Sequence, residues 1–315
     1  MLEILRFMSQ TLTGISVAMD ILSSTIAAIR TGSPSSGLFV RHAPWGRRYP
    51  VVPGAGFHVV LEGSCWLLPP DGIPVALAAG DVVFMPRGAD HGLADRAGTP
   101  LTETAHPGEP RVIDGPGARS TLLCGAYDIG RAHVHPLLAE LPEFVRLPAQ
   151  AGGLTPLRSV VDLLLAEVTG QSLGSDAAVP ALLDTMLLFL LRAWLDEPRD
   201  RESGWAAALS DPAVAAALRA VHDDPARAWS LSELAARAAV SRATLARRFD
   251  ATIGEPPLSY LARWRMLLAA RLLRDTSDPL AVVARAVGYG SEFAFAKAFK
   301  RHHGTAPGAY RRQAA

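Results

Sequence analysis

The alternation of apolar and polar residues changes character about halfway along the 315-residue chain. Between about residues 37 and 130, short apolar runs alternate with turns rich in Gly and Pro. This pattern predicts an all-β unit with strands at 57–68, 75–86 and 119–129. After residue 150, apolar residues recur with the 3.6-residue period of an α-helix. We therefore predict an α+β protein of two domains, an N-terminal β-barrel with following helices and a C-terminal all-α domain.

Two helices are expected directly after the β unit, at 154–169 and 178–196. The second contains the run "VPALLDTMLLFLLRAWL", which is interrupted by Asp184 and Arg192. It falls short of the roughly 18 uninterrupted apolar residues expected of a membrane span. We interpret it as a buried helix, expect no membrane partner, and interpret the charged segment 196–204 as a linker.

Helix-capping signals punctuate the chain after residue 210. A capping box is expected where Ser230 and Glu233 can each satisfy a backbone N–H of the other. Ser, or Asp directly before Pro, is typical of helix starts, and Gly followed closely by Pro is typical of helix ends. The predicted starts are at Asp211, Ser230, Ser241, Asp278 and Ser291, and the predicted ends are at Gly254 and Gly304.

These caps belong to an internal repeat. Residues 231–261 and 280–311 both read as helix, tight turn, Ser-capped helix, Gly, Pro and an aromatic residue, and their capping serines are 50 residues apart. The spacing predicts two helix-turn-helix units, at about 229–250 and 278–303, joined by a long helix near 257–274.

The second helix of each unit has an apolar face and a polar face. Leu245 and Phe249 in one helix, and Phe295 and Phe299 in the other, lie four residues apart and predict a small core under each helix. The opposite face is expected to meet DNA. The predicted DNA-binding residues are Arg242, Ala243, Thr244, Arg247, Arg248, Ser291, Glu292, Phe293, Lys297, Lys300 and Arg301.

Among these residues, the arginines and lysines are expected to act in two ways. Arg247 is placed to read a guanine edge, because its forked donors match O6 and N7. Arg248, Lys300 and Arg301 are expected to contact phosphates, which adds affinity without sequence information. For a single unit, solvated arginines on an exposed helix would be an equal alternative, and the duplication favours DNA.

The distribution of charge supports the prediction that the C-terminal part binds DNA. The formal net charge is +1, but residues 206–315 hold 16 Lys and Arg against 9 Asp and Glu. The rest of the chain is acidic, so a polyanion-binding module attached to another domain is indicated.

The segment "GYGSEFAFAKAFKRHHGTAPGAYR" and the repeat around it resemble the AraC/XylS family of transcription regulators over about residues 210–312. The resemblance implies two helix-turn-helix units in successive major grooves of double-stranded DNA, with RNA polymerase as a further partner. It places Arg242, Ala243 and Arg247, and then Glu292, Phe293 and Lys297, at base-facing positions. Lys297 stands where arginine is common and Phe293 where polar residues are frequent, so we expect the first unit to be the main reader of sequence.

The β unit carries a second set of motifs. "GDVVFMPRGADH" has the spacing of the second motif of the cupin barrel, which ends at His91. His58 and Glu62 match the last two ligands of the first cupin motif, whose first histidine is replaced by Gly56. His58, Glu62 and His91 are therefore weak candidates for a divalent metal site, and we expect a metal-free pocket or packed histidines instead.

Residues 20–145 also resemble the cupin sensor half of a subset of AraC-type regulators, in the stretches "FHVVLEGSCWL", "GDVVFMPRGADH", "LLCGAYDI" and "HPLLAELP". The resemblance implies that the barrel senses a signal and that the following helices pack beside it or pair two chains. The predicted divisions are a possible N-terminal extension at 1–18, a cupin-like sensor domain at 19–145, a helical dimerisation or linker region at 146–200 and the DNA-binding domain at 206–315.

The candidate effector-sensing residues are His58, Cys65, His91 and Cys124. The two cysteines are the only thiols in the chain, and both fall in the β unit. If their strands are neighbours, oxidation could join them, and a nearby histidine could promote the reactive thiolate. The alternative is that each is a small buried apolar residue and that the effector is a small organic molecule.

Three functions remain open at this point. The first is a transcription regulator whose cupin half senses a small molecule or an oxidant. The second is a cupin metalloenzyme, of dioxygenase or isomerase type, fused to a DNA-binding domain. The third is a constitutive DNA-binding protein with a structural barrel. We expect the first of these functions and no enzymatic activity. Because two cysteines form no disulfide framework and the N-terminus lacks a leader pattern, we expect a cytoplasmic protein. We also expect a homodimer.

Overall fold

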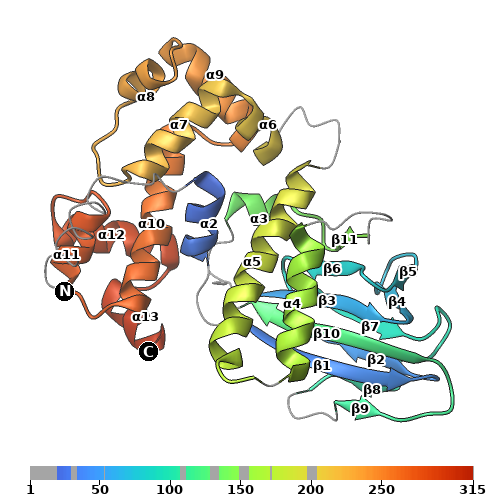
Figure 1. Cartoon of the computed structure of the whole chain (residues 1–315). Helices are drawn as coiled ribbons and strands as arrows, with labels where there is room; N and C mark the ends of the chain where they lie inside the picture. The colour runs from blue at the N-terminus through green and yellow to red at the C-terminus, as the bar shows by residue number, and fades with distance from the viewer. Residues whose placement is uncertain are drawn as a thin grey trace, which may run out of the picture.

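A computed structural model describes residues 20–29, 34–52, 54–106, 111–127, 135–148, 156–170, 172–196 and 204–314. The chain forms a β-sandwich flanked by two long helices, followed by an array of shorter helices (Figure 1). The predicted α+β architecture with a β-rich N-terminal part and an all-α C-terminal part is confirmed. The predicted extension at 1–18 lies outside the described residues.

Two sheets build the β part, with orders β11-β6-β3-β10-β1-β9 and β5-β4-β7-β2-β8. The expected strands 57–68 and 75–86 are each two strands, because Gly63 and Gly80 take positive φ values of 74° and 93° and turn the chain. The strands are β1 (Ser35–His42), β2 (Gly46–Tyr49), β3 (Ala55–Glu62), β4 (Ser64–Leu68), β5 (Val75–Ala78), β6 (Val82–Met85), β7 (His91–Ala94), β8 (Glu103–Thr104), β9 (Val112–Ile113), β10 (Arg119–Tyr127) and β11 (Val145–Leu147).

The six-stranded sheet is buried on both faces. Along β3, Phe57 and Val59 belong to an outer core, whereas Val60 belongs to an inner core between the two sheets. His58 lies on the inner side and lines a cavity there. Successive residues of β3 point to opposite faces of the sheet, and both faces are buried, so β3 is an almost continuous apolar run.

Helices α4 (Pro156–Gly170) and α5 (Ser175–Asp196) cover the outer face of the six-stranded sheet (Figure 1). The hydroxyl of Tyr127 at the end of β10 donates to the Leu183 carbonyl at 2.7 Å and ties α5 to the sheet. In the described part of the chain, α5 alone is long and apolar enough to cross a membrane. Leu183, Leu190 and Trp194 on α5 are buried in the outer core, which explains its composition as that of a core helix.

The remaining helices form the C-terminal part and its junction with the sandwich. They are α2 (Ile21–Ile29), α3 (Pro136–Glu140), α6 (Gly204–Ser210), α7 (Pro212–Asp223), α8 (Leu231–Arg237), α9 (Arg242–Ile253), α10 (Pro257–Asp275), α11 (Leu280–Ala286), α12 (Glu292–His303) and α13 (Pro307–Ala314). The pairs α8–α9 and α11–α12 are the two predicted helix-turn-helix units, and α10 is the predicted connecting helix.

Most of the predicted caps are present. The side chains of Ser241 and Ser291 accept from the N–H groups of Thr244 and Ala294, and Ser230 and Glu233 form the reciprocal capping box. The cap predicted at Asp278 is wrong. Pro279 occupies the N-cap position of α11, so Asp278 lies one residue outside the helix and its side chain caps nothing.

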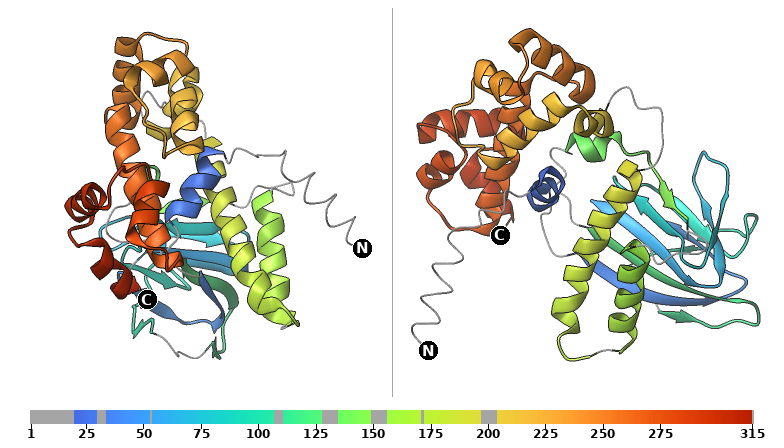
Figure 2. Two further views of the ribbon diagram at one scale, coloured as in Figure 1. Left: turned by 90° about the vertical axis from the view of Figure 1, so that its left-hand side faces the viewer. Right: turned by 45° about the horizontal axis from the view of Figure 1, so that its top comes forward.

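The two helix-turn-helix units have separate cores that share α10. Tyr260 and Trp264, in the first half of α10, pack into a core that contains the first unit and continues through α6 to the outer face of the sheet. Ala270 and Leu273, in the second half, pack with Phe295 and Phe299 in a core of their own. Figure 2 shows α10 running lengthwise from one unit to the other.

Helix α2 lies between the sandwich and the C-terminal helices, a placement that sequence reasoning missed (Figure 2). A chain of buried hydrogen bonds crosses this junction. The Ser24 hydroxyl donates to the Ile21 carbonyl at 2.9 Å, so it accepts from Nδ1 of His222 at 2.6 Å. The other ring nitrogen of His222 then accepts from the Tyr260 hydroxyl at 2.6 Å. Burial lowers the pKa of His222 to about 3, which keeps the ring neutral and this direction of donation intact.

We expect Gly254→Ala and Gly304→Ala each to destabilise the protein by about 1–2 kcal/mol. Both glycines end a recognition-type helix in the left-handed region, with φ of 80° and 74°, and an added Cβ would meet no atom within 4 Å. The cost is therefore backbone strain alone, and urea unfolding measures it.

The matched control for this prediction is Gly290→Ala, where an added Cβ also meets nothing within 4 Å but φ lies outside the left-handed region. This variant should stay within about 0.5 kcal/mol of the parent. Equal losses of unfolding free energy in all three variants would show that the left-handed conformation is not the source of the destabilisation.

Candidate nucleic-acid interface and barrel pocket

The outward face of α9 is polar and basic. Arg242, Ala243 and Arg247 are exposed, whereas Leu245 and Phe249 on the opposite face are fully buried. The separation follows from the helical period, because positions four apart stack on one side. Arg247 is thus held on a rigid helix with its guanidinium free to reach a neighbouring molecule's surface.

The outward face of α12 is built in the same way but has different chemistry. Phe295 and Phe299 are buried, and the ring of Phe293 is 81% exposed. The predicted residues Glu292, Lys297, Lys300 and Arg301 on this helix are exposed as well, as are Ala294 and the cap residue Ser291. The structure thus brings the residues predicted for the second unit onto one exposed helix.

Two predicted DNA-binding residues of α9 already have side-chain partners within the protein. Arg248 makes a 3.3 Å ion pair with Asp211, whose carboxylate also caps the start of α7. The hydroxyl of Thr244 lies 2.9 Å from that of Ser241. These contacts fix α9 relative to α7 and leave Arg247 as the exposed arginine of the pair Arg247–Arg248.

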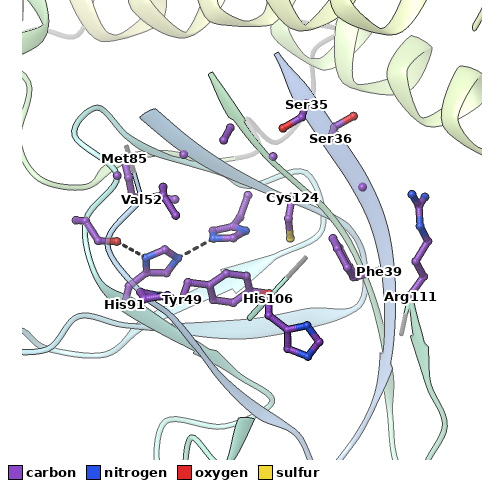
Figure 3. Close-up of a pocket in the computed structure, with 18 residues that line it drawn as sticks. Ser35, Ser36, Phe39, Tyr49, Val52, Met85, His91, His106, Arg111 and Cys124 are labelled. Atoms are coloured by element: carbon purple, nitrogen blue, oxygen red, sulfur yellow. Dashed lines mark hydrogen bonds between the residues drawn. The ribbon is translucent and has the colours of Figure 1, made fainter. Parts of the chain in front are cut away.

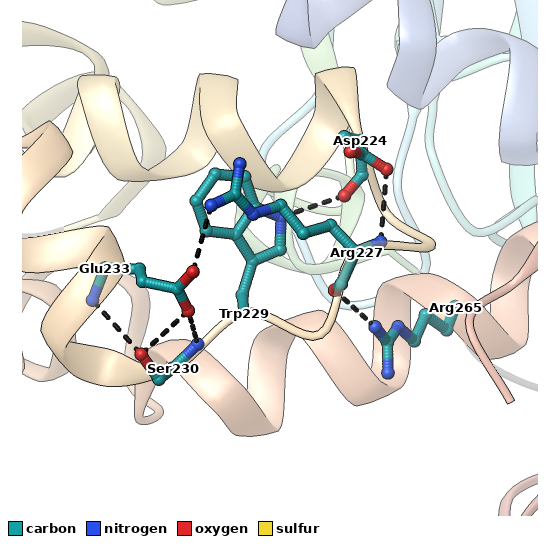
Figure 4. Close-up of polar contacts among 6 residues, drawn as sticks. All are labelled: Asp224, Arg227, Trp229, Ser230, Glu233 and Arg265. Atoms are coloured by element: carbon teal, nitrogen blue, oxygen red, sulfur yellow. Dashed lines mark hydrogen bonds and ion pairs between the residues drawn. The ribbon is translucent and has the colours of Figure 1, made fainter. Parts of the chain in front are cut away.

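The loop before α8 is fastened to α10 by a contact that sequence reasoning missed (Figure 4). Arg265 on α10 donates to the carbonyls of Pro225 and Arg227 at 2.7 and 2.8 Å. The Arg227 guanidinium in turn lies 4.2 Å from the ring centre of Trp229. The guanidinium of Arg227 and the hydrogen bonds of the capping box lower the pKa of Glu233 to about 2, so its carboxylate stays ionised. The capping box was visible in the sequence, but the ion pair of Glu233 with Arg227 and the hydrogen bonds from Arg265 on α10 to the loop were not.

A cavity of about 380 Å³ opens between the two sheets (Figure 3). Its walls are mainly apolar, with Phe39, Val52 and Met85 among the lining residues. The polar groups His58, His91 and Cys124 also line it, as do Tyr49, His106 and Arg111. Three of the four predicted effector-sensing residues therefore meet at one pocket.

The two histidines of the pocket are hydrogen-bonded to each other. Nδ1 of His91 donates to the Ala89 carbonyl at 2.7 Å, because a carbonyl can only accept. Its Nε2 then accepts from Nε2–H of His58 at 2.7 Å. Desolvation lowers the pKa of both rings, with the proximity of His91 adding to the effect at His58, so both rings are neutral. This arrangement leaves Nδ1 of His58 as a buried acceptor without a partner.

Tyr49 completes this group and was not predicted. Its ring stacks on His91 at 5.1 Å between centroids and meets His58 edge-on at 4.7 Å. Tyr49 lies opposite His91 in the β2–β7 ladder. Only the strand register reveals this neighbour, since the two residues are far apart in the chain.

The weak metal candidates His58, Glu62 and His91 do not come together as one site. Glu62 accepts from the Thr121 hydroxyl at 2.9 Å, lies 3.5 Å from Arg119 and is more than half exposed. A register shift in the β3–β10 ladder falls between His58 and Glu62, so the alternation of faces is interrupted. Within the ranges that the structure describes, no group of three or more His, Cys, Asp or Glu could hold a metal ion.

The two cysteines do not lie in neighbouring strands. Cys65 lies in β4 of the five-stranded sheet and Cys124 in β10 of the six-stranded sheet, and both are free and buried. Cys124 lines the cavity, but Cys65 packs in the inner core. Burial raises the pKa of each thiol to about 12, so both thiols are protonated. The histidines nearby are neutral and supply no positive charge that would stabilise a thiolate.

Comparison with known proteins agrees with both halves of this geometry. A cupin family model matches residues 20–196, and a helix-turn-helix domain model matches residues 234–313. A putative AraC-like transcription regulator of Streptomyces antibioticus is 38% identical over 93% of this chain and 99% of its own length.

The chain belongs to the AraC family of transcription regulators.

Other relatives of this AraC-family protein carry similar names. The HTH-type transcriptional regulator MtrA of Neisseria gonorrhoeae is 30% identical over 94% of this chain and 99% of its own length. The solved DNA-binding domain of AdpA, in complex with a target DNA, is 36% identical, covers 33% of this chain and 93% of that domain, and has a TM-score of 0.31.

The AraC-family protein is therefore a DNA-binding regulator of transcription with an N-terminal cupin domain. The curated relatives reported above are named as regulators and not as enzymes.

Proposed function

We propose that this AraC-family protein is a ligand-responsive regulator, in which α9 and α12 bind double-stranded DNA and the barrel pocket binds a small molecule. The observation that carries the proposal is the mainly apolar cavity of about 380 Å³ that His58 lines, together with the Nδ1 atom of that ring, which is buried and has no hydrogen-bond partner. A buried polar atom without a partner is costly, so a ligand that donates to it would be favoured.

On the DNA side, Arg247 is the base-reading residue of the proposal. It is exposed on α9, and its forked donors match the O6 and N7 acceptors of guanine. Arg242, Ala243, Glu292, Phe293 and Lys297 share the base-facing surface. Lys300 and Arg301, at the last turn of α12, contact phosphates.

The ligand that suits the pocket is a small, largely apolar molecule with one hydrogen-bond donor. Phe39, Val52 and Met85 offer apolar contacts, while Nδ1 of His58 offers the acceptor. The oxidant alternative receives less support, because both thiols are buried and held in the unreactive protonated form. A cupin enzyme fused to a DNA-binding domain is the other alternative, and the names of the relatives do not favour it.

We also propose that two chains pair through α4. Ser159, Leu163, Ala166 and Gly170 recur at helical spacing on its exposed side, and the Leu163 side chain is 54% exposed. Such an uncharged stripe suits a helix–helix contact between two copies. The regulator would then act as a cytoplasmic homodimer that contacts RNA polymerase at the promoter.

Replacing Arg247 with Ala should cost about 1–3 kcal/mol of binding free energy on a specific DNA site and little on random DNA. Lys300→Ala should weaken both and flatten the salt dependence by about one unit of slope. Fluorescence anisotropy over a salt series measures both effects. Arg96→Ala, an exposed arginine of the sandwich, is the control and should change neither. Equal losses on both DNAs for Arg247→Ala would remove its role in base reading.

For the pocket, we expect p-cresol to bind the protein about two- to tenfold more tightly than p-xylene, since the two differ in one hydroxyl donor. Titration calorimetry measures both affinities. The preference should vanish in His58→Phe and persist in Arg119→Ala, which lies outside the cavity lining. A preference retained in His58→Phe, or no binding of either probe to the parent, would contradict the proposal.

For the dimer, Leu163→Glu should convert the protein to a monomer and weaken binding to a two-site DNA at least about tenfold, because linked binding raises the effective concentration. Sedimentation velocity reads the mass directly. The control is Ile73→Glu, at a residue that is 86% exposed between β4 and β5. A dimer that survives Leu163→Glu would place the contact elsewhere.

A further inference from the structure

Phe293 is the most exposed aromatic side chain among the large apolar residues of the described chain, at 81%. The other phenylalanines of α12 behave in the ordinary way, since Phe295 and Phe299 are fully buried. An exposed phenyl ring forfeits the free energy that burial would supply. The ring therefore gains stabilisation only when another molecule covers it.

The position of Phe293 points to what covers it. It is the second residue of α12, two positions after the cap at Ser291. The 50-residue repeat makes it the counterpart of Ala243, which is exposed beside Arg242 at the start of α9. The first turn of a recognition helix is the part that reaches base edges in the major groove.

The chemistry of the ring narrows the target further. A phenyl ring neither donates nor accepts a conventional hydrogen bond, so it cannot read the amino, carbonyl or N7 groups of the base edges. The apolar group that base pairs present in the major groove is the C5 methyl of thymine. A large ring at this position also covers more of the groove floor than the methyl of Ala243 does in the first unit.

We infer that Phe293 is a specificity-determining residue that packs on a thymine methyl in the half-site bound by α12. The second unit then selects thymine by apolar contact, whereas the first selects guanine through Arg247. This inference rests on the proposed binding of α12 in the major groove, and it gives the second unit a sequence preference of its own.

The test uses the full-length protein and a duplex selected from random sequence by that protein. Each thymine of the α12 half-site is replaced in turn by deoxyuridine, which removes only the C5 methyl. The parent should lose about fourfold in affinity at one position, the value for a single buried methylene-sized group. Phe293→Ala should bind the thymine and deoxyuridine duplexes equally, and Phe293→Leu should restore part of the difference. Lys300→Ala is the control and should keep the full thymine preference while weakening all duplexes.

Equal binding of the parent to every deoxyuridine duplex would overturn the inference, as would a thymine preference that survives Phe293→Ala. Loss of transcription in Phe293→Ala with unchanged affinity and thymine preference would also overturn it, because the ring would then face a protein. If the parent selects no sequence at all, the proposed DNA-binding mode fails before Phe293 is tested. The side chain of Phe293 is exposed, so these variants are expected to fold like the parent.

Discussion

Neither helix-turn-helix unit can bury its apolar side chains alone, and both depend on the one helix that joins them. Tyr260 and Trp264 complete the core of the first unit, and Ala270 and Leu273 complete that of the second. A helix of 19 residues is about 28 Å long, comparable with one turn of DNA. Because α10 is packed along its whole length, the separation of α9 and α12 is set by a rigid rod and not by a linker. This constraint is what makes two short recognition helices into one DNA-binding surface.

The two units are not equivalent in their attachment to the rest of the molecule. The core of the first unit continues through α6 to the outer face of the six-stranded sheet, whereas the second unit has an isolated core. Buried hydrogen bonds from Ser24 through His222 to Tyr260 hold this junction together. Buried hydrogen bonds of this kind tolerate little displacement, because each broken bond leaves a polar group unpaired. A displacement of α2 would therefore disturb the hydrogen bond of Tyr260 on α10, the helix against which both α9 and α12 pack.

For the proposed ligand response, the same junction would connect the pocket with the helices proposed to bind DNA. Ser35, Ser36 and Phe39 of β1 line the cavity, and α2 precedes β1 in the chain. Hydrogen bonds orient the rings of His58 and His91, and Tyr49 packs against both of them. The Nδ1 atom of His58 is left as a buried acceptor without a hydrogen-bond partner. In the proposed function, such a pocket would select a ligand by the position of one donor on an apolar body.

What could be predicted from the sequence depended on how local the signals were. The repeat, the Ser caps and the Gly helix ends lie within about 30 residues of each unit, so helical period and capping chemistry were enough to locate α8–α9 and α11–α12. The cap expected at Asp278 failed because one residue of offset decides which group faces the helix. The cupin motifs likewise located β3 and the turn before β7, since a motif describes a short stretch of chain.

The remaining features depend on which segments meet across the fold, and no local pattern encodes that. The register shift in the β3–β10 ladder turned Glu62 away from His58, and the division into two sheets separated the strands of Cys65 and Cys124. Tyr49 reached the histidines through pairing of β2 with β7, and α2 reached His222 across the junction. The chemistry of each side chain was legible in the sequence, but its neighbours, its burial and hence its protonation were decided by long-range packing.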